Sequence, residues 1–265
     1  SRHGSSFRHD SSIYNAIQLH VRSSTAGIIA EDDSAKLGNL SISDVASHAF
    51  SKALNSTTLT LHRIATLCCG AVWLTSDDPN VNNKSLPIEK RPVNGEPTDS
   101  AVLRFATGVN PVFAEKWCFE THQNEYTTLF TMAFNSNNKY MAVVVQKADD
   151  PSSTPFLYVK GAPDILLSFC SHALSQEGVK DPMDEPALIK IDSDVMQKIS
   201  YAQETAAGDG LRVIACIQQP LEAFADPTVS FPDNNDDWEV EVKKALKNNA
   251  AQFVGMLAIC DPPRP

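Results

Sequence analysis

The sequence predicts an α+β fold built on a mainly antiparallel, twisted sheet of about six or seven strands flanked by helices. Strand-like stretches follow one another through short polar turns, which join antiparallel neighbours. Helix-like stretches are grouped along the chain and do not alternate with the strands, as a parallel βαβ sheet would require. The 265 residues contain no internal repeat.

The composition is that of a soluble globular domain. Hydrophobic residues make up 42% and charged residues 20% of the chain, which is enough apolar material for a complete core. The 22 basic residues are outnumbered by 32 acidic ones, so the formal net charge is -10. Because an acidic surface repels phosphate backbones, we do not expect nucleic acid as a partner.

The sequence shows neither a membrane span nor an export signal. Its longest apolar runs have about eight residues, whereas roughly twenty are needed to cross a bilayer. The first residues lack the apolar core of a secretory signal. The six cysteines show no CxxC spacing, which favours buried thiols over disulfides or a metal site. We therefore expect a cytosolic chain that does not insert into the membrane itself.

Residues 1–58 read as a variable N-terminal segment, with a possible edge strand at 13–21 and a helix at 43–54. The core of the domain is expected over 59–260. Within it, apolar residues recur at three- and four-residue steps over 61–72, which predicts an amphipathic helix.

Two residues of this helix, His62 and Arg63, are interpreted as structural. A second helix opens at Pro97, because proline suits the first turn of a helix. A third helix is predicted at 111–119.

The second half of the chain supplies most of the strands. A polar turn at 135–138 between two apolar stretches predicts a β-hairpin. The strands are expected at 127–133, 140–146, 156–159, 211–217 and 253–260. Helices are expected at 162–170 and at 193–207, the latter ended by Gly208. An acidic loop is expected over 226–237.

Several motifs of enzyme chemistry are absent. The sequence has no GxxxxGK[ST] phosphate loop, no GxGxxG after a strand, and neither HExxH nor GxSxG. Asp192 and Asp194 superficially resemble a paired-aspartate phosphatase site, but they stand at a helix start, where capping explains them better. We identify no catalytic residue and no metal ligand.

Four phrases do form a pattern, namely GEPTDSA at 95–101, FNSNNKY at 134–140, KGAPD at 160–164 and DPPR at 261–264. Their order and spacing resemble the nucleotide-binding domain of P-type ATPases, closest to the Na,K-ATPase and H,K-ATPase group. The resemblance covers residues 59–265 and is weak over the first 58. It implies that 59–260 is the nucleotide-binding core, and that 261–265 is the hinge to a phosphorylation domain, with Asp261 and Arg264 at the border.

The resemblance also implies roles for residues that, taken alone, are a turn aromatic, solvated charges and a first-turn helix acid. Phe134 would stack on adenine, and Gly161 would let the base approach the backbone. Lys160 would lie deep in the pocket, with Lys139 as a second lysine. The remaining positions of the expected pocket are Asp99 near the adenine amino group, Arg212 toward the phosphates, Ser136 and Met141.

Two positions depart from the family pattern. The relatives usually have glutamate where this chain has Asp99, and glutamine where it has Met141. The contact with the adenine edge is therefore expected to be longer, or mediated by water.

The resemblance implies an ATP-binding module in the cytoplasmic part of an integral membrane cation pump. Its partners would be ATP or ADP and the phosphorylation and actuator domains of the same polypeptide. The family's catalytic DKTGT motif does not occur in the sequence, so we expect no hydrolysis by this chain alone and Mg2+ only together with the phosphorylation domain. The alternatives are an interaction or regulatory module of the same fold with a weakened pocket, and a free-standing phosphatase.

Overall fold

The structure, a computed structural model, describes residues 19–22, 55–75, 85–86, 88–108, 119–181, 183–226 and 228–260. The helix predicted at 43–54, most of the helix predicted at 111–119 and the expected hinge residues Asp261 and Arg264 lie outside these ranges. Among the described residues, no helix is long and apolar enough to cross a membrane.

The main sheet has eight strands, one more than the upper limit of the prediction, and is largely antiparallel as predicted. Seven of them follow the order β4-β5-β6-β9-β10-β7-β8, and β1 pairs with β10. Their bounds are Leu19–Arg22 (β1), Tyr126–Met132 (β4), Tyr140–Lys147 (β5), Phe156–Gly161 (β6), Cys170–Ser175 (β7), Ala187–Lys190 (β8), Arg212–Pro220 (β9) and Ala251–Cys260 (β10). Among the strands that the structure describes, the β1–β10 and β10–β7 pairs are parallel and the others antiparallel.

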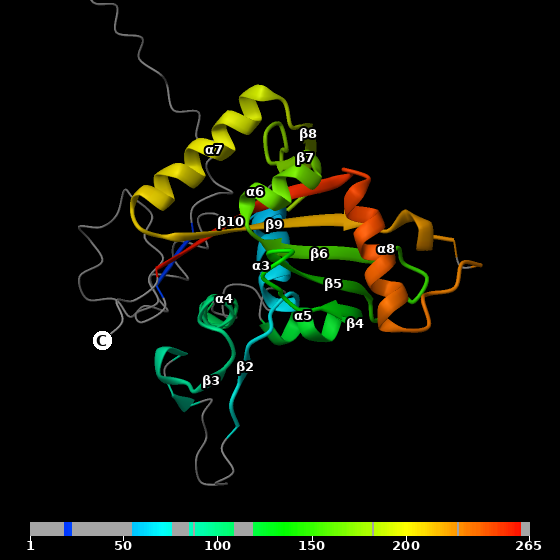
Figure 1. Ribbon diagram of the computed structural model, residues 1–265, viewed down its shortest axis with the longest axis horizontal. Coiled ribbons are helices and arrows are strands. Elements are labelled where there is room, and N and C mark those ends of the chain that lie inside the picture. Colours follow the sequence, from blue (N-terminus) through cyan, green and yellow to red (C-terminus); the bar gives the residue numbers. More distant parts are fainter. Residues whose placement is uncertain are drawn as a thin grey trace, which may run out of the picture.

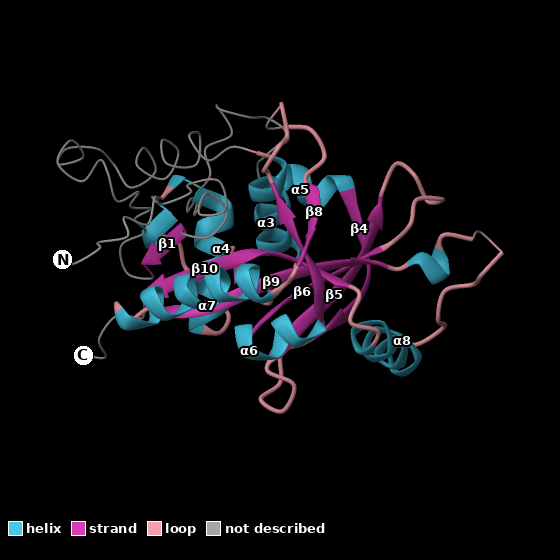
Figure 2. Cartoon of the chain, turned by 90° about the horizontal axis from the view of Figure 1, so that it is seen from above, coloured by secondary structure: helices cyan, strands magenta, loops and turns pink. Residues whose placement is uncertain are grey.

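Helices cover both faces of the sheet (Figures 1 and 2). One layer holds α3 (Ser56–Leu67), α4 (Pro97–Gly108) and α5 (Phe119–Glu125), and the other holds α6 (Pro163–Leu166), α7 (Ser193–Gly208) and α8 (Asn235–Lys247). Alternate residues of β5 therefore enter two different cores: Met141 and Val143 pack under α3 and α4, whereas Ala142 and Val144 face the other layer. A strand that is buried on both faces reads as a continuous apolar run.

Helix α3 begins earlier and ends earlier than the periodicity predicted. Asn55 and Thr58 form a capping box, in which each side chain accepts a hydrogen bond from the other's backbone amide. The helix ends at Leu67, and Val72 lies instead in the short strand β2 (Val72–Trp73), which pairs with β3 (Val93–Asn94). The prediction of a helix as far as Val72 was wrong, because the spacing of apolar residues does not show where a helix ends.

The acidic stretch at 226–237 does not remain a loop to its end. Asn234 caps α8, whose first turn contains Asp236 and Asp237. The buried residues Trp238 and Val242 then repeat at helical spacing. Strands β7 and β8 were also missed, because both are short and β7 follows directly on the helical segment that ends at Phe169.

Candidate functional site

The turn between β4 and β5 is held by local hydrogen bonds. The Oδ1 atom of Asn135 accepts from the amides of Asn137 (3.1 Å) and Asn138 (2.8 Å), and the Lys139 amide donates to the Asn135 carbonyl (2.8 Å). Lys139 adopts a left-handed backbone with φ of 59°. The ring of Phe134, at the start of this turn, is 61% exposed. An aromatic face is thus offered to solvent from a well-defined turn.

Gly161 lies at the end of β6, directly opposite Tyr140. A Cβ atom at position 161 would lie 2.5 Å from the Lys139 carbonyl oxygen and 2.6 Å from the Tyr140 Cβ. The Ala162 amide also donates to the Lys139 carbonyl, at 3.0 Å. Only glycine lets the end of β6 come so close to the hairpin, and this brings Lys139 beside the KGAP segment.

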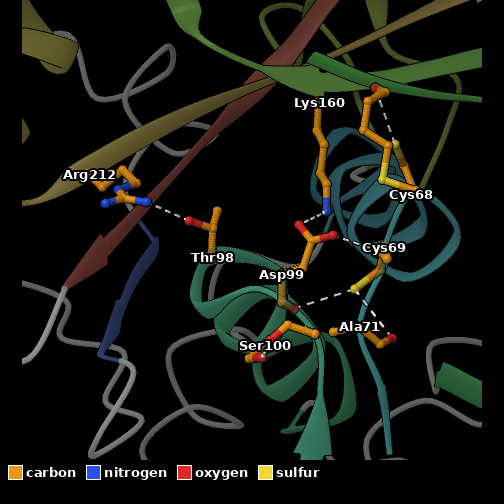
Figure 3. A network of polar contacts seen from close by, with 11 residues as sticks. Cys68, Cys69, Ala71, Thr98, Asp99, Ser100, Lys160 and Arg212 are labelled. Carbon is orange, nitrogen blue, oxygen red and sulfur yellow. Dashed lines mark hydrogen bonds and ion pairs between the residues drawn. The ribbon is translucent and has the colours of Figure 1, made fainter. Parts of the chain in front are cut away.

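Lys160, one residue earlier, is almost fully buried, with 4% of its surface exposed. It pairs with Met141 across the strands, so both side chains enter the face that α3 and α4 cover. Its Nζ lies 2.5 Å from Oδ1 of Asp99 in the first turn of α4, and Oδ2 of Asp99 accepts from the Gly70 amide at 2.7 Å (Figure 3). The buried ammonium therefore has a well-held counter-charge.

The electrostatics of Lys160 follow from these neighbours. Burial acts to lower the pKa of Lys160, but Cys68, Cys69 and Asp99 together outweigh it, and the pKa is raised. Burial raises the pKa of the Cys68 thiol to about 12, so this thiol is neutral near pH 7. Asp99 is therefore the group that compensates the ammonium charge at neutral pH.

Of the two adjacent cysteines, Cys69 contacts Asp99 and Cys68 contacts β5. The Sγ atom of Cys69 contacts the Asp99 carbonyl oxygen at 3.4 Å, and that of Cys68 contacts the Met141 carbonyl oxygen at 3.5 Å. Cys68 belongs to the core, as predicted. Among the described residues, no cluster of three or more His, Cys, Asp or Glu side chains is placed to hold a metal ion.

Arg212, at the start of β9, donates from Nη1 to the Thr98 hydroxyl at 2.7 Å (Figure 3). Thr98 precedes Asp99, so Arg212 and Lys160 contact adjacent residues of α4. Sequence reasoning did not identify Thr98 or Gly70 as members of this network. Thr98 could have been suspected from its place beside Asp99, but nothing in the sequence marks the Gly70 amide.

The expected pocket residues thus fall into two groups. Phe134, Lys139 and Gly161 lie around the hairpin end, whereas Asp99 and Arg212 are linked through the first turn of α4. Lys160 joins the groups, since it precedes Gly161 and contacts Asp99. Ser136 is exposed in the hairpin turn, and Met141 is buried in the core with 5% exposure.

An antiparallel sheet between two helical layers, with a KGAP segment at a strand end and an exposed hairpin aromatic beside it, defines the class of protein: the N domain of a P-type ATPase. The chain belongs to this family, since the family model described as the cytoplasmic domain N of P-type ATPases matches residues 57–265. The chain is also similar to the human sodium/potassium-transporting ATPase subunit alpha-4, with 30% identity over 205 residues. This alignment covers 77% of the chain and 17% of the relative's length.

Proposed function

We propose that the chain binds ATP by its adenine and ribose end and presents the terminal phosphate to the phosphorylation domain of a cation-pumping P-type ATPase. The proposal follows from membership of the N-domain family. The observation that carries it is the 61% exposed ring of Phe134, held on a hydrogen-bonded turn beside Lys139 and Gly161. An exposed aromatic face next to an ammonium group is a suitable platform for a nucleobase that carries phosphates.

The adenine edge would meet Asp99. This carboxylate already accepts from Lys160 and from the Gly70 amide, but a carboxylate has about four lone-pair sites. With 17% of its side chain exposed, Asp99 keeps room to accept from an amino group, directly or through water. Because its position is fixed before binding, little ordering is required when the ligand arrives.

The phosphates would be attracted by Lys139 and Arg212, both of which are exposed. The sequence lacks the GxxxxGK[ST] motif, whose loop binds phosphates through backbone amides. Stacking contributes about 1–3 kcal/mol per base, and a few further polar contacts suggest a dissociation constant on the order of 0.1–1 mM. Weak binding suits a module that must release product in every cycle.

The remaining parts of the reaction would lie elsewhere in the polypeptide. The sequence has no DKTGT motif, and we propose that the phosphorylated aspartate and the Mg2+ site belong to the phosphorylation domain, joined through a hinge that contains Asp261 and Arg264. The actuator domain would be the other partner. On this proposal the chain is a cytoplasmic part of an integral membrane pump and does not hydrolyse ATP alone.

The test is an ATP titration of the chain, followed by amide chemical shifts. We expect Phe134→Ala to raise the dissociation constant by about 5- to 100-fold, since it removes about 1–3 kcal/mol of stacking. The matched control is Tyr201→Ala, which removes an aromatic ring that is 54% exposed on α7 and should leave the affinity unchanged. If wild type and Phe134→Ala bind ATP with the same dissociation constant, the assignment of the ATP site to Phe134 is refuted.

The second candidate is an interaction module with a weakened pocket. The burial of Met141 favours it, because the side chain packs in the core and offers no hydrogen-bonding group where the relatives usually have glutamine. Failure of ATP to bind at several millimolar would support this alternative over ours. Release of inorganic phosphate from a generic phosphate ester by the pure chain would instead revive the phosphatase.

A further inference from the structure

A cavity lies on the same face of the sheet as Lys160, toward the other end of β6. Phe156 and Tyr158 line it, whereas Lys160, two residues beyond Tyr158, contacts Asp99. The cavity has a volume of about 610 Å³, which is large enough for a small organic molecule. Arg63 of α3 forms part of its wall.

The guanidinium of Arg63 is held mainly by aromatic side chains. It donates a hydrogen bond to the Tyr158 hydroxyl, and Tyr158, Tyr126 and the more distant Glu125 raise its pKa against the effect of burial. Its Cζ lies 5.1 Å from the centroid of the Tyr126 ring, and its Nε is buried without a hydrogen-bond partner. Among the described residues, the ion pairs within 4.0 Å involve other cations and none involves Arg63. Arginine stays protonated at any physiological pH, and charges that leave water are normally paired. The cavity therefore has in its wall a cation that no described carboxylate contacts within 4.0 Å.

The rest of the cavity indicates which kind of anion fits. Phe156, Leu174 and Leu188 give it apolar walls, beside polar lining residues. The amide nitrogen of Gln218 already donates to Gln252, at 2.9 Å. These walls suit an apolar body more than a second polar group.

The rim adds a further selection. The exposed residues Glu185, Glu222 and Lys147 also line the cavity. Two carboxylates against one ammonium disfavour ligands with several negative charges, such as nucleotides or inorganic phosphate. A planar carboxylate matches the fork of a guanidinium and carries a single charge.

We propose that this cavity is a binding site for a small monocarboxylic acid with an apolar body, whose carboxylate pairs with Arg63. The apolar body lies against Phe156, Leu174 and Leu188. The site is separate from the proposed ATP pocket, because none of its lining residues belongs to the hairpin turn or to the first turn of α4. Its occupancy does not depend on the ATP proposal.

The test compares 4-phenylbutanoate with its neutral amide, 4-phenylbutanamide, by calorimetric titration of the whole chain. We expect the acid to bind at least about ten-fold more tightly than the amide, because a charge-assisted hydrogen bond is worth more than a neutral one. Arg63→Met keeps an unbranched side chain and removes the charge, and should abolish that difference. Lys190→Met removes an exposed charge outside the cavity and should preserve it.

The comparison of acid and amide on the wild-type chain needs no variant, so it decides the question even if Arg63→Met does not fold. Equal affinity for acid and amide would overturn the proposal, as would an unchanged preference in a folded Arg63→Met chain. The absence of binding up to about 10 mM acid would also overturn it. Tighter binding of inorganic phosphate than of 4-phenylbutanoate would overturn the assignment to monocarboxylates.

Discussion

Lys160 and Arg63 are two cationic side chains beneath one face of the sheet, and they are compensated in different ways. Lys160 is buried, and Asp99, itself held by the Gly70 amide, lies 2.5 Å from its ammonium. Arg63 faces the Tyr126 ring and has no carboxylate within ion-pair distance among the described residues. The Lys160 ammonium is thus neutralised within the fold. On our proposal, the Arg63 guanidinium pairs with the carboxylate of a ligand in the cavity.

The largest expected effect on stability comes from the removal of Asp99, the counter-charge of Lys160. Asp99→Ala leaves the Lys160 ammonium buried and unpaired, which should lower the free energy of unfolding by about 3–5 kcal/mol. Urea denaturation of the chain measures it. The matched control is Asp194→Ala, which breaks an exposed pair with Lys198 on α7 and should cost less than about 1 kcal/mol.

The double variant Asp99→Ala/Lys160→Met sharpens this result. Because it removes both charges, it should recover part of the stability that Asp99→Ala loses. If Asp99→Ala unfolds at the same urea concentration as Asp194→Ala, then the ion pair does not anchor α4 on the sheet, and the contrast with Arg63 disappears.

The second effect concerns two histidines beside Arg63. The rings of His62 and His122 lie 5.2 Å apart. Burial, which is the main cause, and the neighbouring charge of Arg63 lower the pKa of His62 to about 4, although its bond to the Ala106 carbonyl opposes them. Burial, His62 and Arg63 lower the pKa of His122 to about 3. The carboxylate of Glu125 lies 3.6 Å from its Nδ1.

The sign of the pH dependence follows from these directions. Between about pH 6.5 and pH 4 the unfolded chain binds a proton at each histidine and the folded chain does not. Stability is therefore complete above pH 6.5 and is lost as the pH falls, by about 3 kcal/mol for His62. We expect His122→Phe to have a shallower decline than wild type in urea denaturation between pH 7 and pH 4. Identical slopes in the two proteins would contradict the burial of His122 as a neutral group.

The burial of Lys160 shows what sequence could and could not predict. The KGAP phrase, the hairpin and the helix from Pro97 were all recognisable, because turn residues, proline and alternation act locally. The burial was not recognisable, because it depends on the register that pairs Lys160 with Met141 and on Asp99, which is 61 residues away. Taken alone, a lysine is a solvated charge.

The neighbours of Arg63 and the helix α8 were also not predicted from the sequence. Arg63 was interpreted as structural, since helical spacing does not show that its neighbours are Tyr126 and a cavity instead of a carboxylate. The helical spacing of Trp238 and Val242 was present in the sequence. The acidic residues before them were interpreted as a loop. Those acids favour the first turn of a helix, where they meet its positive end.

The smallest effect, and the sharpest check of the comparison, is expected from Arg63→Met. No ion pair within 4.0 Å is broken, but the variant loses the contact with the Tyr126 ring, worth about 0.5–2 kcal/mol, and the hydrogen bond to Tyr158. It also relieves the cost of keeping a guanidinium away from water. These losses and this relief oppose each other, so the free energy of unfolding in urea should change by less than about 2 kcal/mol. A loss as large as that in Asp99→Ala would mean that Arg63 is as firmly compensated as Lys160, and the cavity would then contain no available cation.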